Sequence, residues 1–153
     1  MQRVYAAVQG VEALAWHRGT GRWPAHRDAY GDDVRALLER CEVRSPEEVA
    51  WAAALREELR REYADLFGAV DVLLAPVALC GPSRTDSPDV GPHGPLRGSV
   101  LPWTVPADLA GLPACAIRAG TDSVGLPVGL QVMGPTGADA RVLDVAGELD
   151  LPG

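Results

Sequence analysis

Hydrophobic residues recur every three or four positions in several parts of the chain, the spacing that places them on one face of an α-helix. The pattern predicts amphipathic helices over residues 3–17, 32–40, 45–67 and 137–149. Residues 22–30, which lack the pattern, are expected to form a connecting loop over the surface. The face expected to be buried in the first helix carries Val4, Val8, Val11 and Ala15, and the second helix is expected to turn Val34, Leu37 and Leu38 inward.

The third helix has the clearest start and stop signals. Ser45 can cap its first turn, Pro46 suits the first helical position and Glu48 completes a capping-box pattern. Gly68 supplies a stop. One face is apolar and the rest is charged, so this helix is expected to bury that face in the core. The apolar face comprises Trp51, Leu55, Leu59, Tyr63 and Leu66.

Short apolar runs in the second half are typical of buried strands instead. They cover residues 70–75, 114–119 and 127–133, and the last two each follow a Gly-Leu-Pro triplet. Strands this apolar need helices over both faces of their sheet, which predicts an α/β fold. Residues 1–68 are thus mainly helical. Residues 69–153 carry the strands, a Pro/Gly-rich loop at about 81–98, a short helix expected from Thr104 and the terminal helix.

Composition excludes several classes of protein. The 153 residues carry a net charge of -7, which argues against nucleic acid or an anionic membrane as a partner. No apolar run approaches the length of a membrane span, and the N-terminus lacks the shape of a signal peptide. The three cysteines, Cys41, Cys80 and Cys115, have no paired spacing, which favours a reducing, cytoplasmic setting.

Two motifs resemble the C-terminal portion of the amidase signature family. They are G-L-P-A-C-A-I-R-A-G at residues 111–120 and G-L-P-V-G-L-Q-V-M-G-P at residues 125–135, and the D-V-L-L-A-P of residues 71–76 is similar to the family's D-x-L-L-x-P. The resemblance implies that residues 1–153 are the C-terminal part of an amidase domain, with a few strands of a mixed sheet flanked by helices. Asp108 and Arg118 depart from the family, which usually has Asn and Pro at these positions.

The resemblance also implies hydrolysis of carboxamides, a reaction that needs a nucleophile, a base and donors for the oxyanion. In this family a Ser–cis-Ser–Lys arrangement supplies the nucleophile and the base. All 14 basic residues of this chain are Arg, so it contains no Lys, and none of its serines lies in a Gly/Ser-rich loop. We therefore expect no catalytic residue in this chain and no activity from it alone. The position of Trp103 and Thr104 in the resemblance suggests that they line one wall of the acyl pocket.

Other catalytic or metal-binding arrangements find little support. A Ser-His-Asp triad could draw on His17, His26 or His93, but no Gly-x-Ser-x-Gly motif presents a serine. Cys80 at a strand end is a slightly better candidate nucleophile than Cys115, which lies in an apolar strand. No spacing matches a metal site and no motif binds a phosphate group, so neither a metal nor a cofactor is expected.

Two hypotheses about function follow. In the first, the chain works only when joined to, or assembled with, the N-terminal amidase part that holds the nucleophile. In the second, it is a non-catalytic relic of a truncated gene or a small binding or assembly module, and Met1 is then either a genuine start or the result of a frameshift. Either way its open sheet edge is expected to pair with further strands or to cause self-association.

Overall fold

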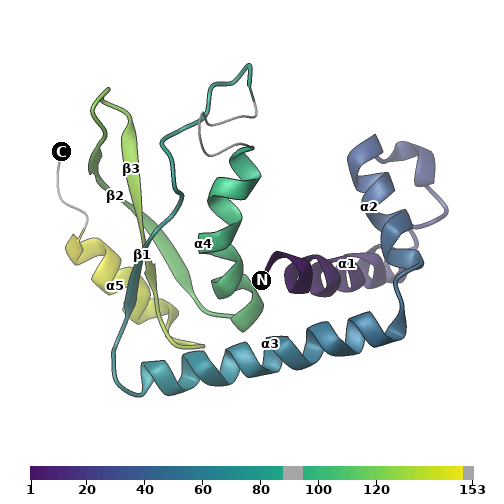
Figure 1. Cartoon of the computed structure of the whole chain (residues 1–153), viewed down its shortest axis with the longest axis horizontal. Helices are drawn as coiled ribbons and strands as arrows, with labels where there is room; N and C mark the ends of the chain where they lie inside the picture. Colours follow the sequence, from purple (N-terminus) through teal and green to yellow (C-terminus); the bar gives the residue numbers. More distant parts are fainter. Residues whose placement is uncertain (88–94, 150–153) are drawn as a thin grey trace. The chain divides into compact units, whose positions relative to one another are not determined.

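The computed structural model describes residues 1–87 and 95–149, which fall into two compact units, Met1–Glu58 and Leu59–Gly153. Figure 1 labels the elements. The first unit contains α1 (Gln2–Gly19), a 3-10 helix (Arg27–Ala29), α2 (Asp32–Glu42) and the start of α3 (Pro46–Phe67), which continues into the second unit. The second unit then follows with β1 (Leu73–Pro76), α4 (Leu96–Ala110), β2 (Ala114–Thr121), β3 (Pro127–Met133) and α5 (Asp139–Leu149).

The core of the first unit lies where α1 and α2 meet. Leu14, Leu38 and Cys41 are buried together there. Gly10 permits the close approach, because a Cβ atom at this position would lie 2.4 Å from the Cys41 sulfur. The buried face of α1 therefore differs from the predicted one and consists of Val4, Ala7, Gly10 and Leu14. The prediction followed the valines and missed the small residues that let the helices come together.

The segment between α1 and α2 was predicted to be a surface loop, and this is only partly correct. Trp23 inserts into the core of the first unit and is 4% exposed. Its ring lies edge-on to that of Tyr30, with the centroids 5.7 Å apart. The segment then forms its 3-10 helix before α2 begins. A single large aromatic residue thus anchors a stretch whose other residues are mostly exposed.

Helix α3 begins where the sequence predicts. The Glu48 amide donates to the Ser45 hydroxyl at 3.2 Å, which confirms the N-terminal cap. The predicted core face is only partly correct: Leu55, Leu59 and Tyr63 are half-buried, whereas Trp51 and Leu66 are 41% and 43% exposed. The buried residue of this helix is Ala52. The spacing was helical as expected, but periodicity alone does not say whether other elements cover an apolar face.

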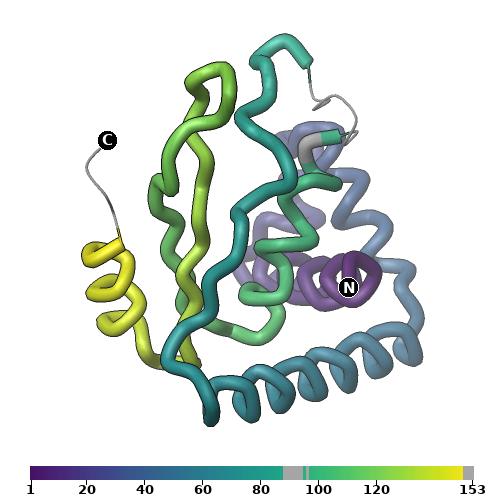
Figure 2. The backbone as a smooth tube through the Cα atoms, turned by 60° about the vertical axis from the view of Figure 1, so that its left-hand side comes forward, coloured from purple at the N-terminus to yellow at the C-terminus, as the bar shows by residue number. Residues whose placement is uncertain are grey.

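The second unit is a sheet with a helix over each face. Its strands lie in the order β1-β3-β2 and both pairings are antiparallel. Val132, near the end of the central strand β3, is fully buried against Val142 and Ala146 of α5. On the opposite face the Gln131 side chain donates to the backbone carbonyl of Trp103 in α4, at 3.1 Å. Figures 1 and 2 both show the sheet between α5 and α4, which confirms the α/β class.

The strands match their predictions closely, and α4 does not. Strand β3 has the expected bounds, whereas β2 runs on to Thr121 and β1 starts at Leu73. Helix α4 begins at Leu96, eight residues before the predicted start, and contains two prolines. A proline inside a helix costs about 3 kcal/mol. Burial of Val105 and Leu109, 0% and 2% exposed, offsets part of it.

Part of the predicted Pro/Gly-rich loop, residues 88–94, lies outside the described residues. Within the described part, residues 81–87 contain no helix or strand, and residues 96–98 belong to α4. Among all the residues that the structure describes, none of the helices combines the length and the apolar character that a membrane span requires.

Candidate functional site

The second unit has an apolar hollow of about 450 Å³ beside the end of β1. After β1 the chain is tied to the sheet by the Val77 amide, which donates to the Gly129 carbonyl of β3 at 3.3 Å, and to α4 by the Leu79 amide, which donates to the Ser99 carbonyl at 3.1 Å. Gly129 makes this possible, since a Cβ atom there would lie 3.0 Å from a Val77 methyl group. The lining comprises residues 77–82, Ala116 and residues 127–129.

A tight turn between β2 and β3 is held by Asp122. Its Oδ1 atom accepts hydrogen bonds from the amides of Val124 and Leu126, both at 2.9 Å. Gly125 takes a positive φ of 84°, which favours glycine. The other carboxylate oxygen of Asp122 lies against Gly81, 3.1 Å from where a Cβ atom would be. One carboxylate thus fixes the hairpin and touches the segment that lines the hollow.

The two residues predicted to line the acyl pocket, Trp103 and Thr104, lie on α4 and do not line this hollow. Thr104 donates its hydroxyl to the Val100 carbonyl at 3.5 Å. The Trp103 indole nitrogen and the Ser99 hydroxyl are both buried and have no partner among the described residues. These two groups, one turn apart on α4, could each hydrogen-bond a further group. The role of Trp103 and Thr104 as a pocket wall stays a prediction.

The candidate nucleophiles occupy separate places within the second unit. Cys80 is half-buried and lines the hollow, whereas Cys115 lies on the sheet face under α5. None of the histidines that the structure describes lines the hollow, so among these residues Cys80 has no imidazole base beside it there. Ser99 is buried within α4, and Ser123 lies in the β2–β3 turn. His93 lies outside the described residues. In the part that the structure describes, no group of side chains could hold a metal ion.

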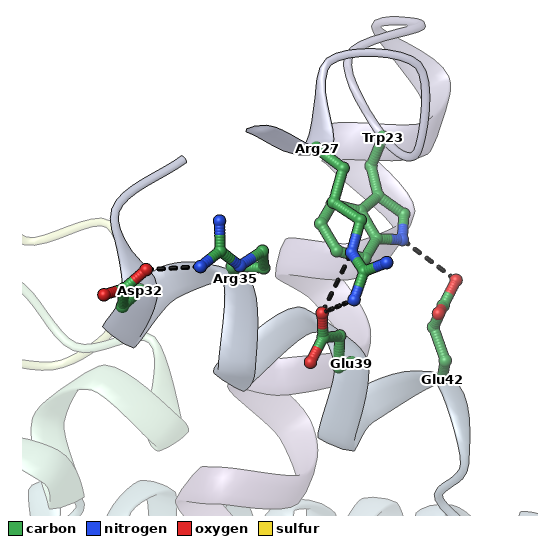
Figure 3. A network of polar contacts seen from close by, with 6 residues as sticks. All are labelled: Trp23, Arg27, Asp32, Arg35, Glu39 and Glu42. Atoms are coloured by element: carbon green, nitrogen blue, oxygen red, sulfur yellow. Dashed lines mark hydrogen bonds and ion pairs between the residues drawn. The ribbon is translucent and has the colours of Figure 1, made fainter. Parts of the chain in front are cut away.

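A polar network in the first unit was not predicted (Figure 3). Glu42 accepts hydrogen bonds from the Trp23 indole at 2.9 Å and from Arg18 at 2.6 Å. The indole donor and then the guanidinium lower the pKa of Glu42. Arg27 pairs with Glu39 in the same network. The signal in the sequence was a tryptophan within a segment that lacks helical spacing.

The hollow itself was also missed, although the sequence held a signal. The apolar run continues past the end of β1 as Val-Ala-Leu-Cys over residues 77–80, beyond the proline that closes the D-V-L-L-A-P motif. Such a run without helical spacing indicates chain packed along a sheet. The segment lies against β3 because the Val77 amide bonds to the Gly129 carbonyl, and the spacing of apolar residues does not predict such a contact.

Comparison with known proteins identifies the family. The sequence profile named Amidase matches residues 23–143. The chain belongs to the amidase family. It is 40% identical over 96 residues to a glutamyl-tRNA(Gln) amidotransferase subunit of Synechococcus sp. (strain RCC307), covering 62% of this chain and 19% of that protein. It is 31% identical over 126 residues to the fatty acid amide hydrolase of Medicago truncatula, covering 77% of this chain and 20% of that protein.

Solved amidase structures match nearly the whole chain. A crystal structure of an amidase superimposes with a TM-score of 0.81 at 30% identity, over 95% of this chain and 34% of that one. A bacterial aryl acylamidase of the amidase signature family superimposes with a TM-score of 0.68 at 24% identity, which supports the fold. The chain thus spans about a fifth of its curated relatives' length and about a third of the amidase structure. These matches confirm the predicted family and partial α/β fold.

Proposed function

We propose that this chain is the scaffold portion of an amidase whose nucleophile and base lie outside its 153 residues. One observation carries the proposal. The amidase profile covers residues 23–143, yet the sequence contains no lysine for the Ser–cis-Ser–Lys arrangement that the family resemblance implies. The reaction needs an activated nucleophile, and the candidates in the described residues have no base beside them in the hollow. The chain then acts on carboxamides only together with the N-terminal amidase part.

In such an enzyme the chain supplies part of the structural scaffold and one wall of the acyl pocket. We assign Trp103 and Thr104 to one wall of the acyl pocket, by their place in the family resemblance. The buried indole nitrogen of Trp103 supports this assignment, because it has no partner among the described residues and could hydrogen-bond a group supplied from elsewhere. The outer edges of β1 and β2 are the places where further strands would extend the sheet.

A chimera tests this proposal. In the amidase that superimposes with a TM-score of 0.81, the matching third is replaced by this chain. The chimera is expected to hydrolyse a simple carboxamide that the parent amidase also hydrolyses, because the parent supplies the nucleophile and the base. The parent lacking this third is the negative control, and circular dichroism and size-exclusion chromatography report folding.

The pocket assignment is tested in the same chimera. The Trp103→Phe variant keeps most of the ring but loses the indole donor, and it is expected to raise KM more than it changes kcat. Trp23→Phe is the matched control, because that indole already has a partner in the first unit. A folded chimera without any turnover would count against the scaffold role, and equal effects of the two variants would remove Trp103 from the pocket.

Self-association of the separate chain follows from the same proposal. Strand β2 has β3 on one side and no described partner on the other, and an unpaired strand edge is a template for pairing with another chain. We expect size-exclusion chromatography with light scattering to show dimers or larger species of the 153-residue chain. A heat-stable monomer would argue that no further strands are needed.

A further inference from the structure

A second hollow lies in the first unit, whereas the residues assigned above to the amidase pocket belong to the second unit. It has a volume of about 310 Å³ and is lined by Arg22, His26, Ala29 and Tyr30. These residues all come from the segment that connects α1 to α2 in Figure 1. The volume is at the lower end of the range for small-molecule sites. Two of the four lining side chains carry nitrogen donors and one is aromatic, which suits a small polar ligand with a flat body.

The aromatic wall of this hollow is held in place by several contacts. The Tyr30 hydroxyl and the His17 Nδ1 atom are 2.8 Å apart and share a hydrogen bond. The Tyr30 ring also lies edge-on to Trp23, which is buried and donates its indole hydrogen to Glu42. A wall fixed in this way loses little conformational entropy when a ligand binds.

Arg22 supplies a cation that is not neutralised. Its guanidinium lies 5.5 Å from the centre of the Trp16 ring and has no carboxylate partner among the described residues. None of the four residues lining the hollow is acidic, although the chain as a whole carries a net charge of -7. Six other arginines of the first unit pair with carboxylates, namely Arg3, Arg18, Arg27, Arg35, Arg44 and Arg56.

We propose that this hollow binds a small organic carboxylate with a flat apolar body. The Arg22 guanidinium, which lies over the Trp16 ring, can bind a carboxylate through two parallel N–H donors. The His26 ring can supply a further donor from the same lining, and the Tyr30 ring offers an apolar surface to the ligand's body. Inorganic phosphate would satisfy the cation but leave this aromatic wall without a contact. All four lining residues belong to the first unit, whereas Trp103 and Thr104 belong to the second.

The test is a titration of the complete ¹⁵N-labelled chain with benzoate, acetate and inorganic phosphate at low salt, followed by NMR. Benzoate is expected to shift the side-chain N–H signals of Arg22 and Trp16 in a saturable way, with a millimolar dissociation constant. Acetate and phosphate are expected to bind at least about threefold more weakly, because they lack the flat body. The Arg22→Gln variant is expected to weaken benzoate binding about tenfold, since a charge-assisted hydrogen bond is lost.

Arg40→Gln is the matched control. It removes the same charge from the same unit, at an exposed position on α2 that does not line the hollow. This variant is expected to bind benzoate within about twofold of the unchanged chain, because surface charges act weakly through solvent. His26→Gln provides a second test and is expected to weaken binding about threefold.

The proposal is overturned if benzoate produces no saturable shift up to about 50 mM, well above the dissociation constant of even a weak site. Equal losses in Arg22→Gln and Arg40→Gln would mean general charge attraction and would also overturn it. Phosphate binding as tightly as benzoate would exclude the flat carboxylate as the ligand class. Circular dichroism of each variant verifies that binding, rather than folding, has changed.

Discussion

Replacing Gly10 by Ala tests the packing of α1 on α2. The new Cβ atom would lie 2.4 Å from the Cys41 sulfur, whereas ordinary contacts begin at 3.4 Å, so the helices have to separate by about 1 Å. Overpacking of this kind costs about 1–3 kcal/mol, and the upper end applies because Cys41 is 4% exposed and closely surrounded. The better helix propensity of Ala returns about 1 kcal/mol. The Gly10→Ala variant is therefore expected to lose about 2 kcal/mol.

Urea unfolding followed by far-UV circular dichroism measures this loss. Gly19→Ala is the control in the same helix, because a Cβ atom there meets nothing within 4 Å, and it is expected to leave stability nearly unchanged. The double variant Gly10→Ala with Cys41→Ala is expected to lose less than the sum of the two single changes, since it removes the clashing sulfur. If Gly10→Ala proves as stable as Gly19→Ala, the described contact between α1 and α2 is wrong.

Three further predictions concern other parts of the chain. Gly134→Ala is expected to destabilise the second unit by about 2 kcal/mol in urea unfolding, because its Cβ atom would lie 2.6 Å from a Val142 methyl group, and Val142→Ala should relieve the loss. Ser45→Ala removes the cap of α3 and is expected to cost about 1 kcal/mol in thermal unfolding. The pKa of Glu42 is lowered by the Trp23 indole and by a guanidinium, so its stabilisation is present at neutral pH and is lost as the pH falls through that lowered pKa. Glu42→Gln should therefore lower the urea midpoint at neutral pH and reduce its fall on acidification; an unchanged fall would contradict this.

Local signals in the sequence were sufficient wherever a few neighbouring residues decide the structure. The cap at Ser45 and the bounds of β3 follow from short-range chemistry, and both were predicted correctly. The family was predicted from the Gly-Leu-Pro motifs, and the match over residues 23–143 confirms it.

The predictions failed where contacts distant in sequence decide the outcome. The buried face of α1 depends on the contact between Gly10 and Cys41, which is thirty-one positions away. The spacing of apolar residues within α1 cannot predict that contact. Trp23 lies in a segment without helical spacing and is buried because it packs against Leu14, Leu38 and Cys41, while Glu42 accepts its indole hydrogen. Trp51 has helical spacing within an apolar face but is 41% exposed, because burial requires a second element to cover it.

The sequence named candidate pocket residues but could not place their surroundings, for a different reason. A motif places Trp103 in the family's pattern, but it does not say which groups its side chain faces. The structure shows a buried indole nitrogen on α4 and a separate hollow beside β1, and neither could be located from spacing. The hollow beside β1 is lined by residues 77–82, Ala116 and residues 127–129, which are far apart in the sequence and meet only in the folded chain.

The most direct test of the scaffold role is a carboxamide hydrolysis assay on the purified 153-residue chain. Release of ammonia from acetamide and benzamide is measured against a mock purification from cells lacking the gene. We predict no release above the mock, because the chain has no lysine and none of its serines lies in a Gly/Ser-rich loop. Turnover that coelutes with the chain and is lost in Cys80→Ala or in a serine variant would place the reactive group within these residues and contradict the central claim.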